Sequence, residues 1–373
     1  MISPTIDIAV VGGGPAGLVA ATVAAQAGAS VEVFERDDRA GGILGVQSQP
    51  LQGPSTIFSG VNGFQHCQRL RDAADEVGVR VTLGVEVTTV SPDIDRPGKY
   101  RLTMRAESDD ETELTASCVV LATGSDEPRP GFPGADLVGV MLAGDAQVAL
   151  NFRGQRMGGR VVMAGSDNSG LLIAQDLLDA GANVVAVVEE SPRIVGREFN
   201  AAPLRRAGVE ILTSTRVVSA SGSIRLERVH VLHVDRADRP RQLEADTLCI
   251  AWPRVPRLVL ADQAGCPSVS LDILGGPVPV HARNMATLVP GIFVCGDVSG
   301  VESGAIAMES GRLAGLGAAA QLGLRHPDGQ ALARLARGRL GYLRRGHRGA
   351  LRRAAKRTLH VAHRREVRTG NTA

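Results

Sequence analysis

The segment 6–35 limits most strongly how this chain can fold, because it places a glycine-rich turn between an apolar strand and an alanine-rich helix. The turn contains Gly12, Gly14 and Gly17 in the spacing GxGxxG. A second strand follows the helix and ends on an acid, Glu35, 18 residues after the last glycine. This order predicts a βαβ unit with two parallel strands joined by a right-handed crossover.

Each glycine of this turn has its own physical role in binding a dinucleotide. Gly12 makes the tight turn, Gly14 lets the backbone approach a pyrophosphate, and Gly17 lets the helix pack closely on the strand. The N-terminus of the helix stabilises the phosphate charge. Glu35 is placed to accept hydrogen bonds from a ribose 2′-hydroxyl, and it disfavours a 2′-phosphate. The residues themselves therefore predict a dinucleotide site near the start of the sequence.

A second unit of the same design occupies residues 160–189, so the chain contains an internal duplication. Its loop keeps Gly165 and Gly170, and its second strand ends on Glu189, an acid that favours NAD over NADP. Asp167 replaces the middle glycine, where a carboxylate repels a pyrophosphate and a side chain blocks its approach. Three outcomes stay open for this second site: NAD, a different adenine nucleotide, or no ligand.

Further segments carry a resemblance to a known class of flavoproteins. FERDDRAGG at 34–42, ATG at 122–124 and VPGIFVCGDVSG at 289–300 accompany the first glycine turn. Together they resemble the two-dinucleotide-binding flavoproteins of the thioredoxin reductase and pyridine nucleotide-disulfide oxidoreductase class, over residues 5–323. The resemblance implies FAD, rather than NAD, at the first site.

The resemblance also implies roles for individual residues around FAD. The ATG segment would close the site, and Asp297 would contact the flavin ribityl chain. The helix that starts near Ala305 would direct N–H groups at the N1/O2 side of the flavin, where negative charge develops on reduction. The residues that we assign to FAD on this basis are Gly12, Gly14, Pro15, Ala16, Gly17, Glu35, Arg36, Gly42, Val87, Ala122, Thr123, Gly124, Gly296, Asp297, Ala305, Ile306 and Ala307. The residues of the second site are Gly165, Asp167, Gly170 and Glu189.

A closer resemblance covers the segments 137–151, 158–193, 249–266 and 275–280. They are similar to the α subunits of multimeric amine and amino-acid oxidising flavoenzymes: heterotetrameric sarcosine oxidase, opine oxidase and hydrogen cyanide synthase. The resemblance implies that a separate amine-oxidase-like flavoprotein subunit oxidises a small amine. It implies that the α-type subunit holds another cofactor and takes part in electron transfer.

The cysteines set this chain apart from both groups. Cys67, Cys118, Cys249, Cys266 and Cys295 are far apart, with no CxxC or CxxxxC pair and no spacing typical of metal ligands. We interpret them as buried thiols in a reducing compartment, exclude a disulfide reductase, and expect no metal. Many α subunits of the opine oxidase type have a C-terminal cysteine cluster for an iron–sulfur centre, and no such cluster follows Cys295.

No residue is assigned a catalytic role. His66 and His281 lie in segments that could border the flavin, but a lone histidine is more often structural or exposed to solvent. In flavoenzymes the isoalloxazine carries the hydride chemistry, and the protein supplies orientation and electrostatics. The missing acid or base is therefore compatible with an oxidoreductase.

The charge of residues 324–373 differs from that of the remaining chain. This segment contains 14 Lys and Arg and two acids, a net charge of +12, whereas residues 1–323 carry about −10. Its leucines have a partly helical spacing. Three interpretations stay open: a docking helix, a solvated and partly disordered extension, or a segment that binds nucleic acid or an anionic membrane. Nucleic acid is not expected, because aromatic residues beyond Tyr342 are lacking.

We therefore expect an α/β protein with two Rossmann-like, doubly wound domains and a basic helical C-terminal tail. The FAD domain is discontinuous, at 1–130 and 275–323, the second dinucleotide-binding domain is inserted at 140–260, and the tail is 324–373. No apolar run reaches the roughly 20 residues that span a bilayer, and no secretion signal is recognisable. The expected location is cytoplasmic.

Three functions agree with these observations. The first is an α-type subunit of a multimeric amine or amino-acid dehydrogenase or oxidase, which passes electrons through bound flavin. The second is a self-contained NAD(P)H-dependent flavin oxidoreductase that acts on a small molecule. The third is a non-catalytic, flavin-bearing scaffold whose second site is empty.

Overall fold

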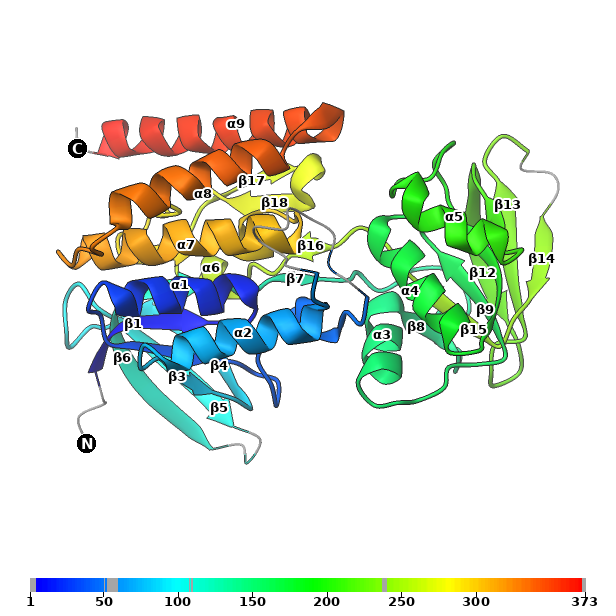
Figure 1. The fold of residues 1–373 in the computed structure, drawn as a ribbon, viewed down its shortest axis with the longest axis horizontal. Helices are drawn as coiled ribbons and strands as arrows, with labels where there is room; N and C mark the ends of the chain where they lie inside the picture. The colour runs from blue at the N-terminus through cyan, green and yellow to red at the C-terminus, as the bar shows by residue number, and fades with distance from the viewer. Residues whose placement is uncertain are drawn as a thin grey trace. The chain divides into compact units, whose positions relative to one another are not determined.

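The computed structural model describes residues 5–49, 51, 60–106, 108, 110–236 and 240–370. The chain forms two compact units (Figure 1). Unit 1 comprises Met1–Gly45, Pro50–Asp126 and Arg254–Ala373, and unit 2 comprises Val46–Gln49 and Glu127–Pro253. The larger part of unit 2 is thus one continuous insertion in the sequence of unit 1.

Unit 1 is built on a mixed sheet with the strand order β3-β2-β1-β6-β5-β4, and β19 adds beside β6. β1 pairs in parallel with β2 and β6, so Val11 lies beside Phe34 on one side and Leu121 on the other. β19 comes from much later in the sequence and places Val294 beside the same Leu121. The strands are β1 (Thr5–Val11), β2 (Val31–Phe34), β3 (Arg80–Thr82), β4 (Val85–Pro92), β5 (Tyr100–Ala106), β6 (Glu111–Leu121) and β19 (Ile292–Val294).

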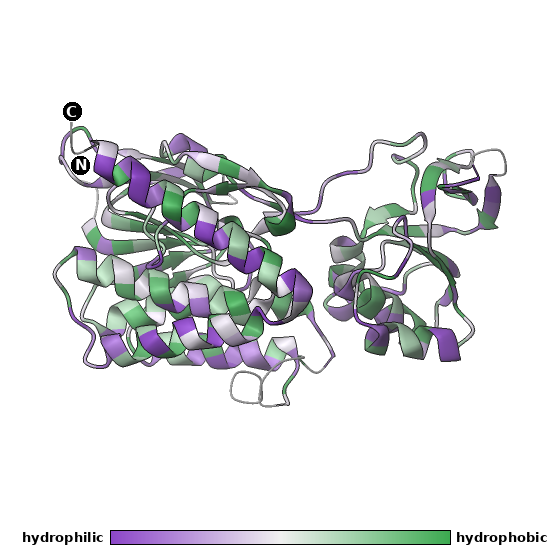
Figure 2. Ribbon diagram, turned by 90° about the horizontal axis from the view of Figure 1, so that it is seen from above, coloured by the Kyte–Doolittle hydropathy of each residue, from purple (hydrophilic) through white to green (hydrophobic). Residues whose placement is uncertain are grey.

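Helices pack on both faces of this sheet because β1 is apolar on both sides. Ile8 and Val10 pack with α1, α2 and α7, whereas Ala9 and Val11 pack with α6 on the opposite face. In Figure 2 the strands are mostly green, as the buried apolar core requires. The helices are α1 (Pro15–Gln26), α2 (Gly63–Asp75), α6 (Val259–Gln263), α7 (Gly304–Gln321), α8 (Gly329–Leu343) and α9 (Gly346–Gly370).

Short elements complete unit 1 around its sheet. Two small antiparallel pairs join β7 to β16 and β17 to β18. Short 3-10 helices lie between the longer elements of the chain. Their bounds are β7 (Ser125–Asp126), β16 (Val255–Pro256), β17 (Ser268–Leu271), β18 (Gly276–Pro279), η1 (Gly42–Val46), η2 (Asp272–Leu274) and η3 (Gly296–Ser299).

The basic C-terminal segment forms α8 and α9, which belong to unit 1. α8 adds Leu340 to the core around α1 and α7, and α9 adds Leu359 to a cluster with Leu274 and Val278. Figure 1 shows α8 and α9 along the side of unit 1 that α7 also covers. The tail is therefore folded onto its own unit over residues 329–370 rather than forming a solvated extension. None of the described helices is long and apolar enough to cross a membrane.

Leu359 provides a direct test of how tightly α9 is packed. Its side chain is fully buried, so Leu359→Ala is expected to lower the free energy of unfolding by about 2–5 kcal/mol. Val361, two residues further on, is 54% exposed, and Val361→Ala is expected to change the free energy of unfolding by less than about 0.5 kcal/mol. Urea denaturation followed by circular dichroism measures both. Equal, small effects would mean that α9 does not pack on unit 1.

Unit 2 has a parallel sheet with the order β11-β10-β9-β15-β8 and a separate antiparallel sheet, β12-β13-β14. α3 (Ala143–Asn151), α4 (Asn168–Asp179) and α5 (Glu198–Arg206) accompany the parallel sheet. The two-domain, Rossmann-like α/β prediction with a helical C-terminus is thus confirmed. The strands are β8 (Val140–Leu142), β9 (Arg160–Ala164), β10 (Asn183–Val188), β11 (Glu210–Leu212), β12 (Thr215–Ser221), β13 (Arg228–His233), β14 (Arg241–Glu244) and β15 (Thr247–Ile250).

Candidate functional site

The turn between β1 and α1 contains two glycines that the packing of the protein itself requires. Gly12 has a φ of +107°, which residues other than glycine rarely adopt. A Cβ atom at Gly12 would collide with the carbonyl oxygen of Ala122, and one at Gly17 would collide with the carbonyl oxygen of Gly12. These two glycines therefore set the shape of the turn whether or not a ligand binds.

Gly14 differs, because nothing among the described residues requires a glycine there. It is the N-cap of α1, with an ordinary φ of −70° and ψ of 177°. A Cβ atom built on Gly14 would meet no atom of the described chain within 4 Å. No side chain caps α1, so the first N–H groups of the helix face outward without that partner. The open space is a cradle that fits a pyrophosphate, whose charge the helix N-terminus would stabilise.

Glu35 follows β2 and lies beside this turn, buried from solvent. Its Oε2 accepts a hydrogen bond from the N–H of Gly13 at 2.7 Å, and its Oε1 accepts one from the N–H of Asp37 at 3.0 Å. Burial raises the pKa of Glu35, and these two N–H groups oppose that rise by stabilising the carboxylate. A carboxylate has about four acceptor positions, so Glu35 retains capacity for the hydroxyls of a ribose.

Three parallel strands of unit 1 end side by side at this edge of the sheet. Val11 and Val294 are both register neighbours of Leu121, so the turns that follow β1, β6 and β19 begin at one level. The pairing of β1 with β6 continues past the end of β6, because Ala122 donates its N–H to the carbonyl oxygen of Val11 at 2.8 Å. The carboxyl ends of parallel strands are where α/β sheets bind ligands.

The segment 122–124 is fixed at this edge by Arg257. Thr123 donates its hydroxyl to the carbonyl oxygen of Arg257 at 3.0 Å, and Arg257 donates its N–H to the carbonyl oxygen of Gly124 at 3.0 Å. The guanidinium of Arg257 pairs with Asp126 and lowers the pKa of that carboxyl. The backbone of 122–124 is therefore held in place before any ligand binds.

The turn after β19 brings Gly296 and Asp297 to the same edge. A Cβ atom at Gly296 would lie 3.0 Å from the Cβ atom of Ala16, so this turn touches the start of α1. Ser125 donates its hydroxyl to Oδ2 of Asp297 at 2.8 Å, and the N–H of Glu302 lies 3.4 Å from Oδ1. Burial raises the pKa of Asp297. A carboxylate held in this way can accept hydrogen bonds from a polyol such as a ribityl chain.

α7 begins directly after this turn, and its first residues are those assigned to the flavin. Ala305, Ile306 and Ala307 are buried, and no side chain caps the helix. The N–H of Ala307 already donates to the carbonyl oxygen of Ser303 at 2.9 Å. The N-terminus of a helix carries partial positive charge, which stabilises a negative charge close to it.

The remaining residues assigned to FAD lie in different surroundings. A Cβ atom built on Gly42 would lie 3.4 Å from the Cα atom of Gly14, so η1 starts against the glycine turn. Arg36 is exposed and lies 3.8 Å from Asp37 in a surface ion pair. Val87 belongs to β4 and is buried in the apolar core. The structure thus brings Gly42 to the turn, and places Arg36 on the surface and Val87 in the core.

The glycine loop of unit 2 repeats the geometry of the first turn. Gly165 has a φ of +107°, and a Cβ atom there would collide with the carbonyl oxygen of Ala251. A Cβ atom at Gly170 would lie 2.6 Å from the carbonyl oxygen of Gly165. Asp167, at the middle position, is the N-cap of α4, and its Oδ1 accepts a hydrogen bond from the N–H of Gly170 at 2.8 Å. A carboxylate of the chain thus occupies the helix N-terminus that a phosphate would use.

Glu189 is also occupied by the protein's own donors. Its Oε2 accepts from both the N–H of Ser166, at 2.9 Å, and the hydroxyl of Ser166, at 2.6 Å. Its Oε1 accepts from the N–H of Ser191 at 2.8 Å. The N–H of Gly196 donates to the carbonyl oxygen of Ser166 at 2.7 Å, so the segment after β10 lies against the loop. Glu189 therefore has three internal donors, whereas two such bonds hold Glu35.

Two features of the second loop do not follow from the sequence reasoning. Asp167 is expected from the sequence to repel a phosphate, although an acid directly before a helix is also a standard capping signal. Ser166 is absent from the predicted site, and no sequence pattern identifies its hydroxyl as a partner of Glu189. The cap could have been predicted, whereas the serine contact depends on the path of the chain.

The thiols and His66 carry no charge near neutral pH. All five cysteines are unpaired and buried, and burial raises the pKa of Cys67, Cys118, Cys249 and Cys295 to about 12. The Nε2 of His66 lies 3.2 Å from the sulfur of Met308, and burial lowers the pKa of His66. Within the described part of the chain, no three His, Cys, Asp or Glu side chains gather into a metal site.

Comparisons with known proteins agree with this geometry. The family model for the pyridine nucleotide-disulphide oxidoreductases matches residues 6–311. The A subunit of opine oxidase from Agrobacterium tumefaciens (strain Ach5) is 29% identical over 87% of this chain and 67% of its own length. The HcnB subunit of hydrogen cyanide synthase from Pseudomonas aeruginosa is 29% identical over 82% of this chain and 69% of its own length. The alpha subunit of sarcosine oxidase from Corynebacterium sp. (strain P-1) is 29% identical over 85% of this chain and 33% of its own length.

The chain thus spans about two thirds of the length of the first two relatives and one third of the third. Among solved structures, the thioredoxin reductase of T. acidophilum has a TM-score of 0.71 at 21% identity, over 86% of this chain and 99% of that one. The L-proline dehydrogenase of P. horikoshii has a TM-score of 0.68 at 20% identity, over 90% of this chain and 59% of that one. These two likenesses support the fold, and the family match and the relatives confirm the resemblance inferred from the motifs.

Proposed function

We propose that this chain, which belongs to the pyridine nucleotide-disulphide oxidoreductase family, is the α-type subunit of a multimeric amine or amino-acid dehydrogenase or oxidase. Flavin-dependent oxidoreduction is the activity of this family. The observation that carries the flavin part of the proposal is the open space beside Gly14, in the turn after β1. The relatives support the subunit role, because they are named as subunits of oxidases and of a synthase.

The residues at this edge fit FAD, and each would hold a different part of it. The N-terminus of α1 would bind the pyrophosphate at Gly14, and Glu35 would accept the ribose hydroxyls. Asp297 would accept hydrogen bonds from the ribityl chain, and the N-terminus of α7 would stabilise negative charge at the ring. Bound FAD supplies a ring that accepts electrons from a donor.

Disulfide reduction is the reaction that this site supports least. The thiolate is the reactive form of a cysteine, and the pKa values of about 12 at Cys67, Cys118, Cys249 and Cys295 keep it unpopulated at neutral pH. His66 is also a poor general acid, since burial lowers its pKa and keeps the ring neutral. Both facts favour electron transfer through the flavin, with the amine oxidised on a separate amine-oxidase-like flavoprotein subunit.

The second dinucleotide site distinguishes the proposed subunit from a self-contained NAD(P)H-dependent oxidoreductase, which would need to bind a nicotinamide cofactor there. Asp167 caps α4 where a pyrophosphate would bind, and the hydroxyl of Ser166 takes an acceptor position of Glu189 that a ribose would use. These contacts favour a unit 2 that holds no NAD in the usual position. They therefore disfavour a self-contained NAD(P)H-dependent oxidoreductase.

The proposal is tested by asking which donor bleaches the flavin under anaerobic conditions. The chain alone, loaded with FAD, is expected to stay oxidised with amino acids and with NADH. After co-expression with an amine-oxidase-like partner, an amine substrate of that partner should bleach the flavin of this chain at least tenfold faster. A Gly14→Val chain that assembles without FAD is the control for absorbance from the partner.

Each other outcome selects a rival function. Rapid bleaching of the isolated chain by NADH would favour the self-contained oxidoreductase. Oxidation of an amine by the isolated chain, at a rate set by its own flavin, would contradict the subunit role. A flavin that no donor bleaches, alone or in the complex, would favour the non-catalytic scaffold.

A further inference from the structure

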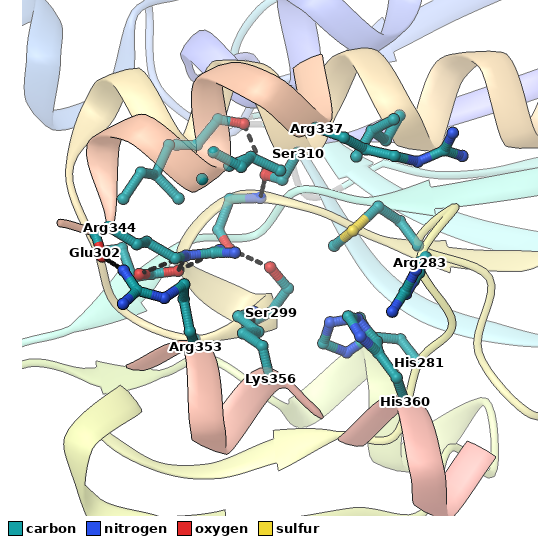
Figure 3. Close-up of a pocket in the computed structure, with 18 of the residues that line it drawn as sticks. His281, Arg283, Ser299, Glu302, Ser310, Arg337, Arg344, Arg353, Lys356 and His360 are labelled. Carbon is teal, nitrogen blue, oxygen red and sulfur yellow. Dashed lines mark hydrogen bonds and ion pairs between the residues drawn. The ribbon is translucent and has the colours of Figure 1, made fainter. Parts of the chain in front are cut away.

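A cavity of about 300 Å³ lies inside unit 1, between η3, α7, α8, α9 and the segment after β18 (Figure 3). None of its lining residues belongs to the β1–α1 turn, to α1 or to Glu35. Its lining includes six cationic side chains and two carboxylates, Asp297 and Glu302. The cations are Arg283, Arg337, Arg344, Arg353, Lys356 and Arg357. The cavity is of the size at which small-molecule sites begin.

The two carboxylates do not balance these cations, because both are already bound. Glu302 forms a two-pronged ion pair with Arg344, with N–O distances of 3.0 Å and 2.6 Å. Asp297 accepts a hydrogen bond from the hydroxyl of Ser125 and belongs to the turn after β19, at the FAD edge. Arg337 has no ion pair among the described residues, and its side chain is exposed at the cavity. The lining therefore has an excess of positive charge.

Lys356 contributes a buried positive charge to this excess. Lysine is rarely buried in proteins unless its ammonium group is paired. The ammonium group of Lys356 donates to the carbonyl oxygen of Ser299 and has no ion pair within the described chain. Burial lowers the pKa of Lys356 to about 8, so the side chain is still mostly protonated at neutral pH. A buried ammonium without a carboxylate is stabilised when an anion joins it.

His281 supplies a second and independent sign of a missing ligand. The ring is fully buried, and its Nδ1 lies 2.7 Å from the carbonyl oxygen of Pro279. A carbonyl oxygen only accepts, so Nδ1 carries the hydrogen. Burial, reinforced by the charge of Lys356, lowers the pKa of His281 well below its usual value, so the ring is neutral. Its Nε2 is then an acceptor, and this buried atom has no hydrogen-bond partner in the described chain.

We propose that this cavity binds a small organic anion, a carboxylate or a phosphate monoester, that also carries a hydroxyl or amino group. The negative group is placed by Lys356 and Arg353, and the hydroxyl or amino hydrogen is donated to Nε2 of His281. The cavity adjoins the FAD edge but differs from it, because neither the glycine turn nor Glu35 lines it, whereas residues of α8 and α9 do. Gly296, Asp297, Ile306 and Ala307, which are among the residues assigned to FAD, also line the cavity.

Isothermal titration of the full chain loaded with FAD tests the proposal, with four probes at constant ionic strength. Glycolate and acetate have the same charge and differ by one hydroxyl, glycerol 3-phosphate supplies a phosphate monoester, and chloride controls for unspecific anion binding. Glycolate or glycerol 3-phosphate is expected to bind saturably, and whichever of them binds more tightly identifies the anionic group. Acetate should bind at least threefold more weakly than glycolate, because it leaves His281 without a donor.

Variants separate the charge from the hydrogen bond. Lys356→Met is expected to weaken the binding of the tighter probe at least tenfold, and Arg368→Met, which removes an exposed charge of α9 outside the cavity, should leave it within twofold. His281→Phe should abolish the preference for glycolate over acetate. If Lys356→Met does not fold, Arg337→Met, whose side chain is exposed, is expected to weaken binding about threefold.

Several results would overturn the assignment. The absence of saturable binding by all the organic probes would mean that solvent fills the cavity. An equal loss in Lys356→Met and Arg368→Met would mean that the binding is a surface charge effect. The same titration of the FAD-free chain is the comparison, and binding to it that disappears when FAD is loaded would mean that the cavity is part of the flavin site rather than a site of its own.

Discussion

Replacing Gly14 with valine is expected to leave unit 1 folded and to weaken FAD binding at least a hundredfold, about 2.8 kcal/mol. The backbone of Gly14 is extended, and a Cβ atom there meets no atom of the described chain within 4 Å. The apo protein therefore has room for the valine. The bound pyrophosphate must approach this backbone closely, so the new side chain occupies the place of the ligand. FAD titration of the apo protein, followed by flavin fluorescence, measures the dissociation constant.

Two other glycines make matched comparisons for this variant. Gly338 of α8 also has an open Cβ position and lies outside the FAD edge, so Gly338→Val is expected to leave the FAD dissociation constant unchanged. Gly17→Ala should instead lower the stability of the protein itself, because the added methyl group would collide with the carbonyl oxygen of Gly12. Unchanged FAD affinity in Gly14→Val would mean that the pyrophosphate lies elsewhere.

The first turn could be predicted from the sequence because its information is local. Gly12 and Gly17 are needed for backbone conformation and for close packing, and both requirements come from atoms within a single βαβ unit and the strand beside it. The fold of both units could be predicted for the same reason, since each repeats strand, glycine loop, helix and strand. That β19 joins the first sheet could also be expected, because its strand and helix need a sheet, but its register beside Leu121 could not, since it joins segments far apart in the sequence.

The cationic cavity could not be predicted, because its parts come from separate segments of unit 1. The sequence showed Lys356 as one charge among many in a basic tail, and His281 as a lone histidine. Only the folding of α9 against η2 and β18 buries both side chains in one place. Deletion of residues 324–373 would expose the unit 1 core that Leu340 and Leu359 cover, so it would disturb the fold as well as any partner surface.

Unit 2 shows that a glycine loop keeps its shape when the middle glycine is replaced. Gly165 and Gly170 are retained by contacts with Ala251 and with each other, which need no ligand. The middle position has no such constraint, and here it carries Asp167, which satisfies the N-terminus of α4. The two outer glycines are thus required by the fold, and we expect the middle residue to decide whether a dinucleotide binds.

Opening the second loop is therefore expected to create NADH binding. The double variant Ser166→Gly with Asp167→Gly should bind NADH about a hundredfold more tightly than the unmodified chain. One charge about 4 Å from another is worth roughly 4 kcal/mol at an effective dielectric constant of 20, so removing Asp167 next to a pyrophosphate is a large effect. Removing the hydroxyl of Ser166 frees an acceptor position of Glu189 for the ribose. NADH fluorescence titration measures the change.

Matched variants distinguish the charge of Asp167 from its bulk. Asp167→Asn keeps an oxygen that can cap α4 and removes the charge, so its gain in NADH affinity should lie between those of the unmodified chain and the double variant. Asp179→Asn removes a charge at the opposite end of α4 and should leave NADH affinity unchanged. The fold should survive the double variant, because glycine at an N-cap costs only a few tenths of a kcal/mol relative to aspartate. If the double variant gains nothing, Asp167 and Ser166 are not what excludes NADH, and the segment that hydrogen-bonds through Gly196 becomes the obstacle to remove.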